Sequence, residues 1–162
     1  MSFAKKRILV TGSTGCIGSH AVDILLGDGK SEVFGFNRSV PEGGSGRDGY
    51  HLITGDLSDP SSVEQAVLDV TPTHVIHLGA LQTPDCRDFP MKGMEVNVLG
   101  TANLFKACTK LKPSPERFVF ASSSAVKQVA RHPSYAFLRK FFSLFYVLAF
   151  SNISSGARAP SP

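Results

Sequence analysis

Short apolar runs alternate with segments of helical periodicity along the first 126 residues, and this alternation constrains the fold more than any other feature of the sequence. Five runs have the length and apolar content of buried strands, at residues 7–11, 32–37, 50–56, 74–79 and 117–123. Helical signals mark residues 16–26, 58–70 and 90–111 between them. Strands joined by helices form right-handed crossovers into a parallel sheet. We therefore predict a doubly wound α/β fold with the spatial strand order 3-2-1-4-5.

The predicted helix at residues 16–26 has one apolar side. Ile17, Ala21, Ile24 and Leu25 are spaced at i, i+4, i+7 and i+8, which places them on one face of a helix. The helix should end near Gly27, because glycine readily adopts the left-handed conformation that closes a helix.

The charge of the chain is concentrated near its carboxyl end. The whole sequence has a formal net charge of +4 at pH 7. Residues 1–126 contain 12 Lys and Arg against 13 Asp and Glu, whereas residues 127–162 contain five basic residues and no acidic one. The first 126 residues therefore show none of the excess positive charge that nucleic-acid binding requires, and we expect no nucleic-acid partner.

Cysteine usage and hydropathy favour a cytoplasmic protein. The three cysteines are widely spaced and form neither a CxxC pair nor a zinc-binding pattern, so we expect reduced thiols and no metal. The apolar run near the amino terminus is too short for a signal peptide. No stretch reaches the roughly 18 apolar residues that a transmembrane span needs.

A glycine-rich segment, VTGSTGCIGSH at residues 10–20, follows the first predicted strand and opens the first helix. Gly12 can form the tight turn, Gly15 leaves room for a pyrophosphate to approach the backbone, and Gly18 lets the helix pack close to the sheet. The N–H groups at the helix start would then face the phosphates. No G-K-[ST] follows, which argues against a triphosphate P-loop. The segment therefore predicts a dinucleotide-binding site.

The end of the second predicted strand bears on which dinucleotide is bound. Asn37 and Arg38 lie there, 19 and 20 residues after Gly18. An acidic side chain at this point would bind the ribose hydroxyls of NAD and repel the 2′-phosphate of NADP. Asn37 does not repel that phosphate, and Arg38 could pair with it. The two residues favour NADP slightly over NAD, although Arg38 could equally be a solvated surface cation.

Four further motifs, taken in order, resemble those of the extended short-chain dehydrogenases/reductases, the NAD-dependent epimerase/dehydratase family. They are GDL at residues 55–57, HLGA at 77–80, NVLGT at 97–101 and SSSAV at 122–126. The resemblance covers residues 7–126 and implies a Rossmann-like domain at residues 1–126 that binds NAD(P). Members of this family typically oxidise and reduce a carbinol carbon of nucleotide sugars or related small molecules.

The resemblance assigns roles to particular residues. Asp56 would contact the exocyclic amine of adenine and Leu57 the ring, while residues 78–80 would lie beside the ribose and pyrophosphate. Asn97 would support the region of the fourth strand, and Ser123 falls on the catalytic serine. The cofactor-binding residues that we predict are Gly12, Thr14, Gly15, Cys16, Ile17, Gly18, Asn37, Arg38, Asp56, Leu57, Leu78, Gly79, Ala80 and Asn97.

Each of these motifs also has a purely structural interpretation when it is taken alone. His77 would then be a core histidine with its hydrogen bonds satisfied, and Asp56 a residue of the turn that follows a strand. The serines at residues 122–124 would be a polar strand end. The joint order of the motifs is what makes the cofactor interpretation strong.

The catalytic tyrosine and lysine of the family have no counterpart in register. After the S-S-x-x-V segment the family continues with Tyr-Gly and then a Tyr-x-x-x-Lys pair, in which the tyrosine is the acid/base and the lysine lowers its pKa. Here Tyr135 comes only 12 residues after Ser123, and Arg139 lies four residues beyond Tyr135. Lys140 is five residues on, which points it to another side of a helix. We therefore expect impaired catalysis.

The composition changes at residue 127. Residues 127–162 lack acidic side chains, and residues 137–150 (FLRKFFSLFYVLAF) are dense in apolar and aromatic ones. We interpret residues 127–162 as a divergent, partly disordered tail in a chain that is truncated relative to the family, with an incomplete sheet. An uncovered fifth strand and this apolar segment predict a poorly soluble or oligomeric chain, with self-association through residues 137–150. A helix that packs on the sheet and attachment to a membrane surface remain open as alternatives for the same segment. An NAD(P)-sensing module and a non-functional truncated product remain open as alternatives.

Overall fold

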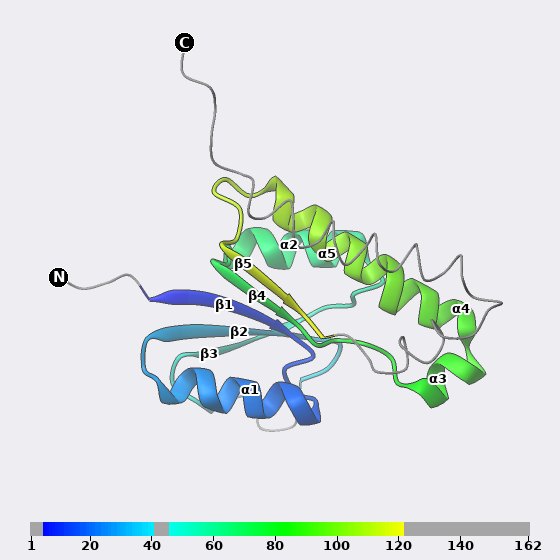
Figure 1. The fold of residues 1–162 in the computed structure, drawn as a ribbon, viewed down its shortest axis with the longest axis horizontal. Coiled ribbons are helices and arrows are strands. Elements are labelled where there is room, and N and C mark those ends of the chain that lie inside the picture. Colours follow the sequence, from blue (N-terminus) through cyan, green and yellow to red (C-terminus); the bar gives the residue numbers. More distant parts are fainter. Residues whose placement is uncertain (1–4, 41–45, 122–162) are drawn as a thin grey trace, which may run out of the picture. The chain divides into compact units, whose positions relative to one another are not determined.

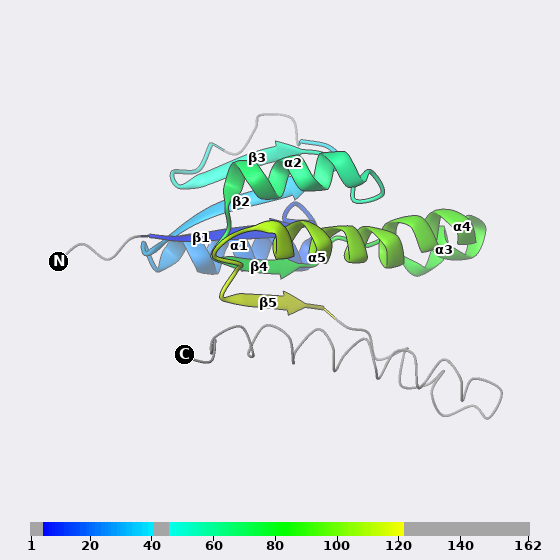
Figure 2. The same cartoon turned by 90° about the horizontal axis from the view of Figure 1, so that it is seen from above.

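The described part of the chain is a five-stranded parallel sheet with helices on both faces (Figures 1 and 2). The computed structural model describes residues 5–40 and 46–121. The strand order is β3-β2-β1-β4-β5, which confirms the predicted fold and order. The strands are β1 (Lys6–Thr11), β2 (Ser31–Asn37), β3 (Tyr50–Thr54), β4 (His74–His77) and β5 (Arg117–Phe120).

The last three strands end earlier than the sequence pattern predicted. β3 ends at Thr54 rather than at residue 56, and β4 ends at His77 rather than at residue 79. β5 ends at Phe120, and the predicted continuation at residues 122–123 lies outside the described residues. The residues that follow β3 and β4 belong to the loops that build the candidate site below.

Helices cover both faces of the sheet, and the sheet separates the core into two clusters. α1 (Cys16–Gly27) lies on one face, and α2 (Pro60–Val70) and α5 (Gly100–Lys110) lie on the other (Figures 1 and 2). Side chains of β1 alternate between the two: Ile8 and Val10 belong to the cluster on the α1 side, and Leu9 to the cluster on the other side. All three are at most 4% exposed, so β1 is buried on both faces, as expected for a central parallel strand.

Two of the four apolar residues that share one face of α1 are exposed. Ile17 and Ile24 are 70% and 75% exposed, whereas Gly18 and Val22 are buried. The reason is a backbone contact: a Cβ atom on Gly18 would lie 2.1 Å from the carbonyl oxygen of Gly12. Because the helix is pressed against the preceding turn at Gly18, the row from Gly18 to Val22 faces the sheet and Ile17 is turned outward.

The segment between β4 and β5 is more broken than the single helix predicted at residues 90–111. It contains α3 (Thr83–Asp88), α4 (Pro90–Gly93), a π-helical turn η1 (Met94–Leu99) and then α5. A π-helical turn inserts a residue into a helix and often marks a functional site. Here η1 contains Asn97, whose side chain holds the loop after β4. α2 is capped by Asp59, whose side chain accepts from the N–H of Ser61.

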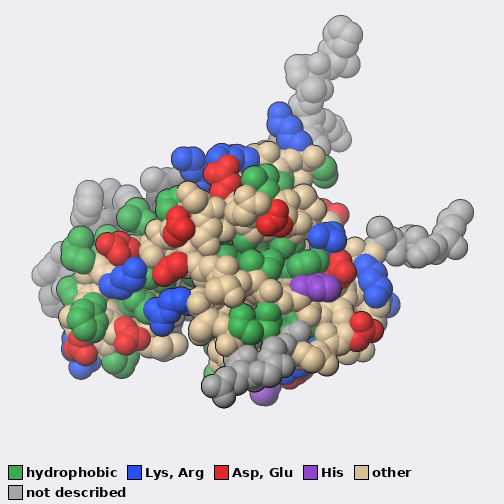
Figure 3. Space-filling model, turned by 180° about the vertical axis from the view of Figure 1, so that it is seen from behind, with side chains coloured by type: hydrophobic (Ala, Val, Ile, Leu, Met, Phe, Trp, Pro, Cys, Tyr) green, Lys and Arg blue, Asp and Glu red, His purple; other side chains and the backbone are tan. Residues whose placement is uncertain are grey.

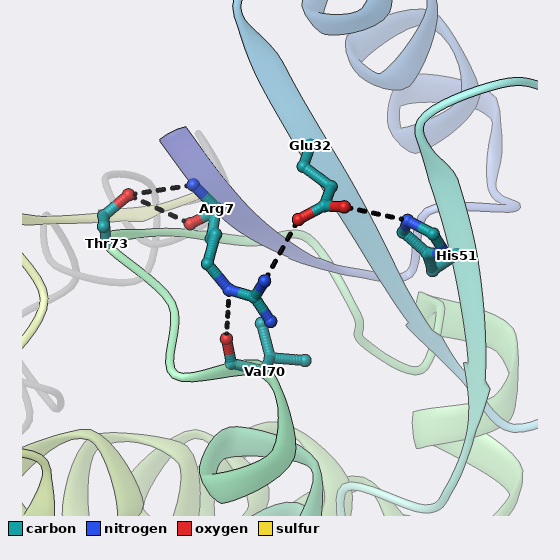
Figure 4. Close-up of polar contacts among 5 residues, drawn as sticks. All are labelled: Arg7, Glu32, His51, Val70 and Thr73. Atoms are coloured by element: carbon teal, nitrogen blue, oxygen red, sulfur yellow. Dashed lines mark hydrogen bonds and ion pairs between the residues drawn. The ribbon is translucent and has the colours of Figure 1, made fainter. Parts of the chain in front are cut away.

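A polar cluster ties the amino ends of three strands to the end of α2 (Figure 4). Arg7 Nε donates to the carbonyl of Val70 over 2.7 Å, and Arg7 Nη1 lies 3.1 Å from Glu32. Glu32 is in turn 3.3 Å from His51 Nε2. Thr73 Oγ1 accepts from the N–H of Arg7 and donates to its carbonyl. A cation at the last carbonyls of a helix is stabilising, so Arg7 acts as a cap for α2.

The surface of the described residues carries interspersed charges of both signs. Lys and Arg side chains alternate with Asp and Glu around apolar atoms on the face shown in Figure 3. No helix among residues 5–40 and 46–121 has the length and apolar content that crossing a membrane requires. Residues 122–162, which include Ser123, Tyr135 and the segment 137–150, lie outside the described part of the chain.

Candidate functional site

The candidate site lies at the carboxyl ends of the strands, at the point where the strand order reverses. From β1 the sheet continues on one side to β2 and on the other to β4. The loops that follow these strands meet at this end of the sheet (Figure 1). Open α/β sheets bind ligands in the crevice at such a switch point. A ligand at this end of the sheet would therefore meet the residues of these loops first.

A Cβ would be blocked at two glycines of the turn between β1 and α1 and would make a single tight contact at the third. Gly12 has a φ of +68°, and a Cβ there would lie 2.8 Å from the Cα of Gly79. Gly18 is blocked by the backbone of Gly12, as described above. A Cβ on Gly15 would meet only the carbonyl oxygen of Gly12, at 3.3 Å. Gly15 is also the N-cap of α1 and forms no side-chain cap hydrogen bond, so no cap side chain satisfies the first N–H groups of the helix.

The Asn37 side chain, at the end of β2, holds this turn by hydrogen bonds. Its Nδ2 donates to Ser13 Oγ over 2.7 Å, and its Oδ1 accepts from both the N–H and the hydroxyl of Thr14, each at 3.2 Å. Ser13 Oγ is also 2.7 Å from the hydroxyl of Tyr50. A Cβ on Gly35 would lie 2.2 Å from Ser13 Oγ, so glycine at that position makes room for the network. The turn is therefore held rigidly to β2 and β3.

Asp56 lies in the turn after β3 with one carboxylate oxygen fully occupied. Its Oδ1 accepts from the N–H of Ser58 at 2.8 Å and from the Ser58 hydroxyl at 2.7 Å. These two hydrogen bonds lower the pKa of Asp56, and the charges of Lys92 and the exposed Arg38 add to the effect, against a smaller opposing contribution from burial. Asp56 is thus an ionised acceptor at the edge of the site.

Leu57 fills the space between the loop after β4 and the start of α5. A Cβ on Gly79 would lie 2.9 Å from Leu57 Cδ1, and a Cβ on Gly100 would lie 2.9 Å from Leu57 Cβ. Two glycines that are 21 positions apart in the sequence therefore make room for one side chain. Leu57 is only 9% exposed, and it joins the turn after β3 to the loop after β4 and to the start of α5.

His77 is a buried, neutral connector rather than an exposed base. Thr101 Oγ1 donates to the carbonyl of Asn97 over 2.8 Å, so it accepts from His77 Nε2 over 2.9 Å. With the proton on Nε2, Nδ1 is an acceptor and receives the hydroxyl of Thr11 at 2.6 Å. Thr11 Oγ1 in turn accepts from the N–H of Gly79 at 3.0 Å. Burial lowers the pKa of His77 to about 4, which keeps the ring neutral at pH 7.

The Asn97 side chain binds both the N–H and the carbonyl of one residue in the loop that follows β4. Its Oδ1 accepts from the N–H of Leu81 over 2.7 Å, and its Nδ2 donates to the carbonyl of Leu81 over 3.1 Å. Nδ2 also lies 3.4 Å from the Sγ of Cys86. The side chain thus fixes Leu81 in the loop that follows β4. No group of His, Cys, Asp or Glu that could hold a metal ion occurs in residues 5–40 and 46–121.

Comparison with known proteins identifies the family to which these motifs belong. Residues 8–134 match the family model described as the NAD dependent epimerase/dehydratase family. The chain belongs to this family. Among relatives, UDP-glucuronate 4-epimerase 4 of Arabidopsis thaliana is 31% identical over 133 residues, which are 74% of this chain and 29% of that protein. This epimerase/dehydratase chain therefore spans about a third of the length of the curated relatives it matches.

Two solved structures similar to this epimerase/dehydratase chain contain NAD. The Thermus thermophilus UDP-glucose 4-epimerase in complex with NAD is 36% identical, with a TM-score of 0.56 over 64% of this chain and 34% of that one. A short-chain dehydrogenase/reductase superfamily protein of Agrobacterium tumefaciens with bound NAD is 36% identical, with a TM-score of 0.60 over 78% of this chain and 35% of that one.

The structure brings nearly all predicted site residues of this epimerase/dehydratase chain to the same end of the sheet. The exception is Ser123, which lies outside the described residues. Sequence reasoning missed Ser13, Tyr50 and Ser58 as partners of the site. The Asp-x-Ser spacing at residues 56–58 is typical of a local side-chain turn and could have revealed Ser58. No local signal points to Tyr50, because it meets Ser13 only after β2 and β3 have paired.

Proposed function

We propose that the chain binds an NAD(P) dinucleotide at the carboxyl ends of its strands. The start of α1 at Gly15, which has no side-chain cap and follows a turn crowded at Gly12 and Gly18, carries this proposal. In it, the N–H groups of Cys16 and Ile17 hold the pyrophosphate, and the loop at residues 78–80 lies beside it. Asp56 receives the exocyclic amine of adenine. The NAD-bound solved structures of similar proteins support the proposal.

The side chains at the end of β2 support a preference for NADP over NAD. Asn37 is neutral, and Arg38 beside it is exposed. A 2′-phosphate next to these two side chains meets one cation and no anion. The Asn37 side chain also holds the glycine turn, so its contribution to binding has two parts, one through the turn and one through the ribose.

We further propose a protein of the nucleotide-sugar epimerase or oxidoreductase type whose turnover is impaired in this chain. Ser123 stands at the position of the catalytic serine, but the 162 residues contain no Tyr-x-x-x-Lys pair in register with it. A bound dinucleotide without this pair fits an NAD(P)-sensing role as the second candidate function. Incubation with UDP-glucose and NAD is expected to give no epimerised product, and turnover that disappears in Tyr135→Phe would contradict the proposal.

The division of the chain and its self-association are proposed on the sequence. Residues 1–126 form the dinucleotide-binding part, and residues 127–162 form a divergent tail whose segment 137–150 brings copies together. β5 adds to this tendency, because Val119 and Phe120 are 44% and 45% exposed. Light scattering should show oligomers of the full chain and more monomer without residues 137–162. The three free cysteines support a cytoplasmic location, which cell fractionation would check.

Calorimetric titration of the full chain with NAD, NADH, NADP and NADPH tests the binding proposal. At least one dinucleotide is expected to bind, weakly because the tyrosine and lysine contacts to the nicotinamide ribose are missing. Gly15→Val should remove binding, because its side chain occupies the phosphate position. Gly27→Val is the matched control, since a Cβ there has no atom within 4 Å. A folded sample that binds none of the four at millimolar concentration would disprove the proposal.

A further inference from the structure

Lys92 reaches from α4 to the turn after β3. Its Nζ donates to Ser58 Oγ over 3.1 Å and lies 3.4 Å from Glu95. An ammonium group can only donate, so Ser58 Oγ is the acceptor in this bond. The single hydroxyl hydrogen of Ser58 is then directed at Asp56 Oδ1, 2.7 Å away. Lys92 therefore sets the direction of the Ser58 hydroxyl, and the hydroxyl sets the orientation of the Asp56 carboxylate.

The hydrogen bonds to Asp56 are unevenly shared between its two oxygens. Oδ1 receives the N–H and the hydroxyl of Ser58. Oδ2 receives no hydrogen bond from the part of the chain that the structure describes. An ionised carboxylate has acceptor capacity on both oxygens, so Oδ2 can take a donor from a ligand. The lowered pKa of Asp56 agrees with this, because the ionised form cannot itself donate.

We propose that Lys92 and Ser58 are positioning residues that make the site selective for a purine with an exocyclic amine. This inference rests on the proposed dinucleotide function and extends it to the base. Adenine presents an N–H donor to Oδ2, whereas hypoxanthine presents a carbonyl oxygen at the same ring position. That oxygen would face the carboxylate with like partial charge and no hydrogen between them. Selectivity then depends on Asp56 being held with Oδ2 toward the base.

Lys92 is well placed to control this orientation without touching the base. Its side chain is 43% exposed, and its Nζ contacts Ser58 and Glu95. Without its ammonium, the Ser58 hydroxyl can rotate away from Oδ1, and the carboxylate loses one of the two bonds that fix it. The remaining bond from the Ser58 N–H cannot prevent rotation about the side chain. The affinity for an amine-bearing base should fall, while affinity for the shared phosphates and riboses is retained.

The test compares NAD with nicotinamide hypoxanthine dinucleotide, in which a carbonyl oxygen replaces the base amine and the adjacent ring nitrogen carries a hydrogen. Calorimetry on the full chain should show tighter binding of NAD, on the order of tenfold, as expected for a hydrogen bond to a charged group. Lys92→Met should reduce this ratio at least roughly threefold, and Lys92→Arg should keep it, because arginine also only donates. Ser58→Ala should reduce the ratio as Lys92→Met does, and it provides a second variant if the first folds poorly.

Lys110→Met is the matched control, since Lys110 forms an ion pair with Glu64 on α2. It should leave the ratio of the two affinities unchanged. A merely structural role of Lys92 would weaken both dinucleotides equally and leave the ratio as it was. If the chain binds NAD but neither Lys92→Met nor Ser58→Ala changes the ratio, the inference fails and the proposed function stands. If the chain binds neither dinucleotide, nor NADP and its hypoxanthine analogue, both fail.

Discussion

His77 Nε2 donates to Thr101 Oγ1 over 2.9 Å, and this bond joins the end of β4 to the first turn of α5. On its other side His77 accepts from Thr11 at the end of β1. The ring is only 2% exposed, and both nitrogens have partners. A second proton on the ring would be on Nδ1, where it would face the hydrogen that the Thr11 hydroxyl already donates to that nitrogen. The site loops are therefore tied together by a histidine that must stay neutral.

We predict that the stability of the chain falls at acidic pH because of His77. Its pKa is lowered by burial to about 4, against 6.5 for an unperturbed histidine. Between these values the unfolded chain binds the proton and the folded chain does not. The stabilisation is fully present above pH 6.5 and is lost as the pH falls toward 4, by at most about 3 kcal/mol. Urea unfolding at pH 7 and pH 4.5 measures the loss.

The variant His77→Gln isolates this effect. It removes the titrating group, so the drop in unfolding free energy between pH 7 and pH 4.5 should be smaller than in the wild type. His74, whose pKa is also lowered chiefly by burial, titrates in the same direction in both proteins and cancels in the comparison. His20→Gln, a change at an exposed position on α1, is the matched control. Equal pH dependence in His77→Gln and the wild type would contradict the role of the ring.

Alanine substitution at two glycines of α1 should have different effects on the free energy of unfolding. Gly18→Ala places a methyl group 2.1 Å from a backbone oxygen, so the helix must shift, at a cost of about 1–3 kcal/mol in unfolding free energy. Gly27→Ala meets no atom within 4 Å and should be neutral or stabilising by up to about 1 kcal/mol. Thermal unfolding of both variants decides the matter. Equal melting temperatures would show that Gly18 does not set the position of the helix.

A carboxylate at the end of β2 should change the preferred cofactor. In Asn37→Asp the new side chain can still accept from Thr14, and Ser13 can donate to it, so the turn should persist. The added charge repels a 2′-phosphate and should lower the affinity for NADPH relative to NADH, roughly tenfold. Asn103→Asp, the same change on α5, is the control. Fluorescence titration of both cofactors measures the ratio, and an unchanged ratio would exclude Asn37 from the ribose site.

The sheet could be predicted from the sequence because its determinants are local. Each apolar run has the length of a strand, and the alternation with helices leaves few parallel topologies. The rotation of α1 was not predictable in this way. Ile17 and Ile24 have the spacing of a buried face, but the contact of Gly18 with Gly12 decides which side of the helix meets the sheet.

In the candidate site too, local motifs could be predicted from the sequence, whereas contacts between residues distant in the sequence could not. The glycine turn and Asp56 could be predicted, because their motifs occupy consecutive residues beside a strand. The contact between Ser13 and Tyr50 joins residues 37 positions apart and needs the space left by Gly35. The reach of Lys92 to Ser58 depends on how α4 lies after β4. Neither contact follows from spacing along the chain.

Alkylation of Cys16 tests most directly whether the dinucleotide binds at the glycine turn. Cys16 is the first residue of α1 and is exposed, whereas Cys108 is buried and its pKa is raised to about 12. Iodoacetamide should therefore label Cys16 readily, and peptide mass spectrometry reports the rate. A bound dinucleotide should slow the labelling of Cys16 in the wild type. In Gly15→Val, adding a dinucleotide should not change the labelling rate of Cys16. Calorimetric binding that leaves the labelling rate of Cys16 unchanged would place the ligand elsewhere and contradict the proposed site.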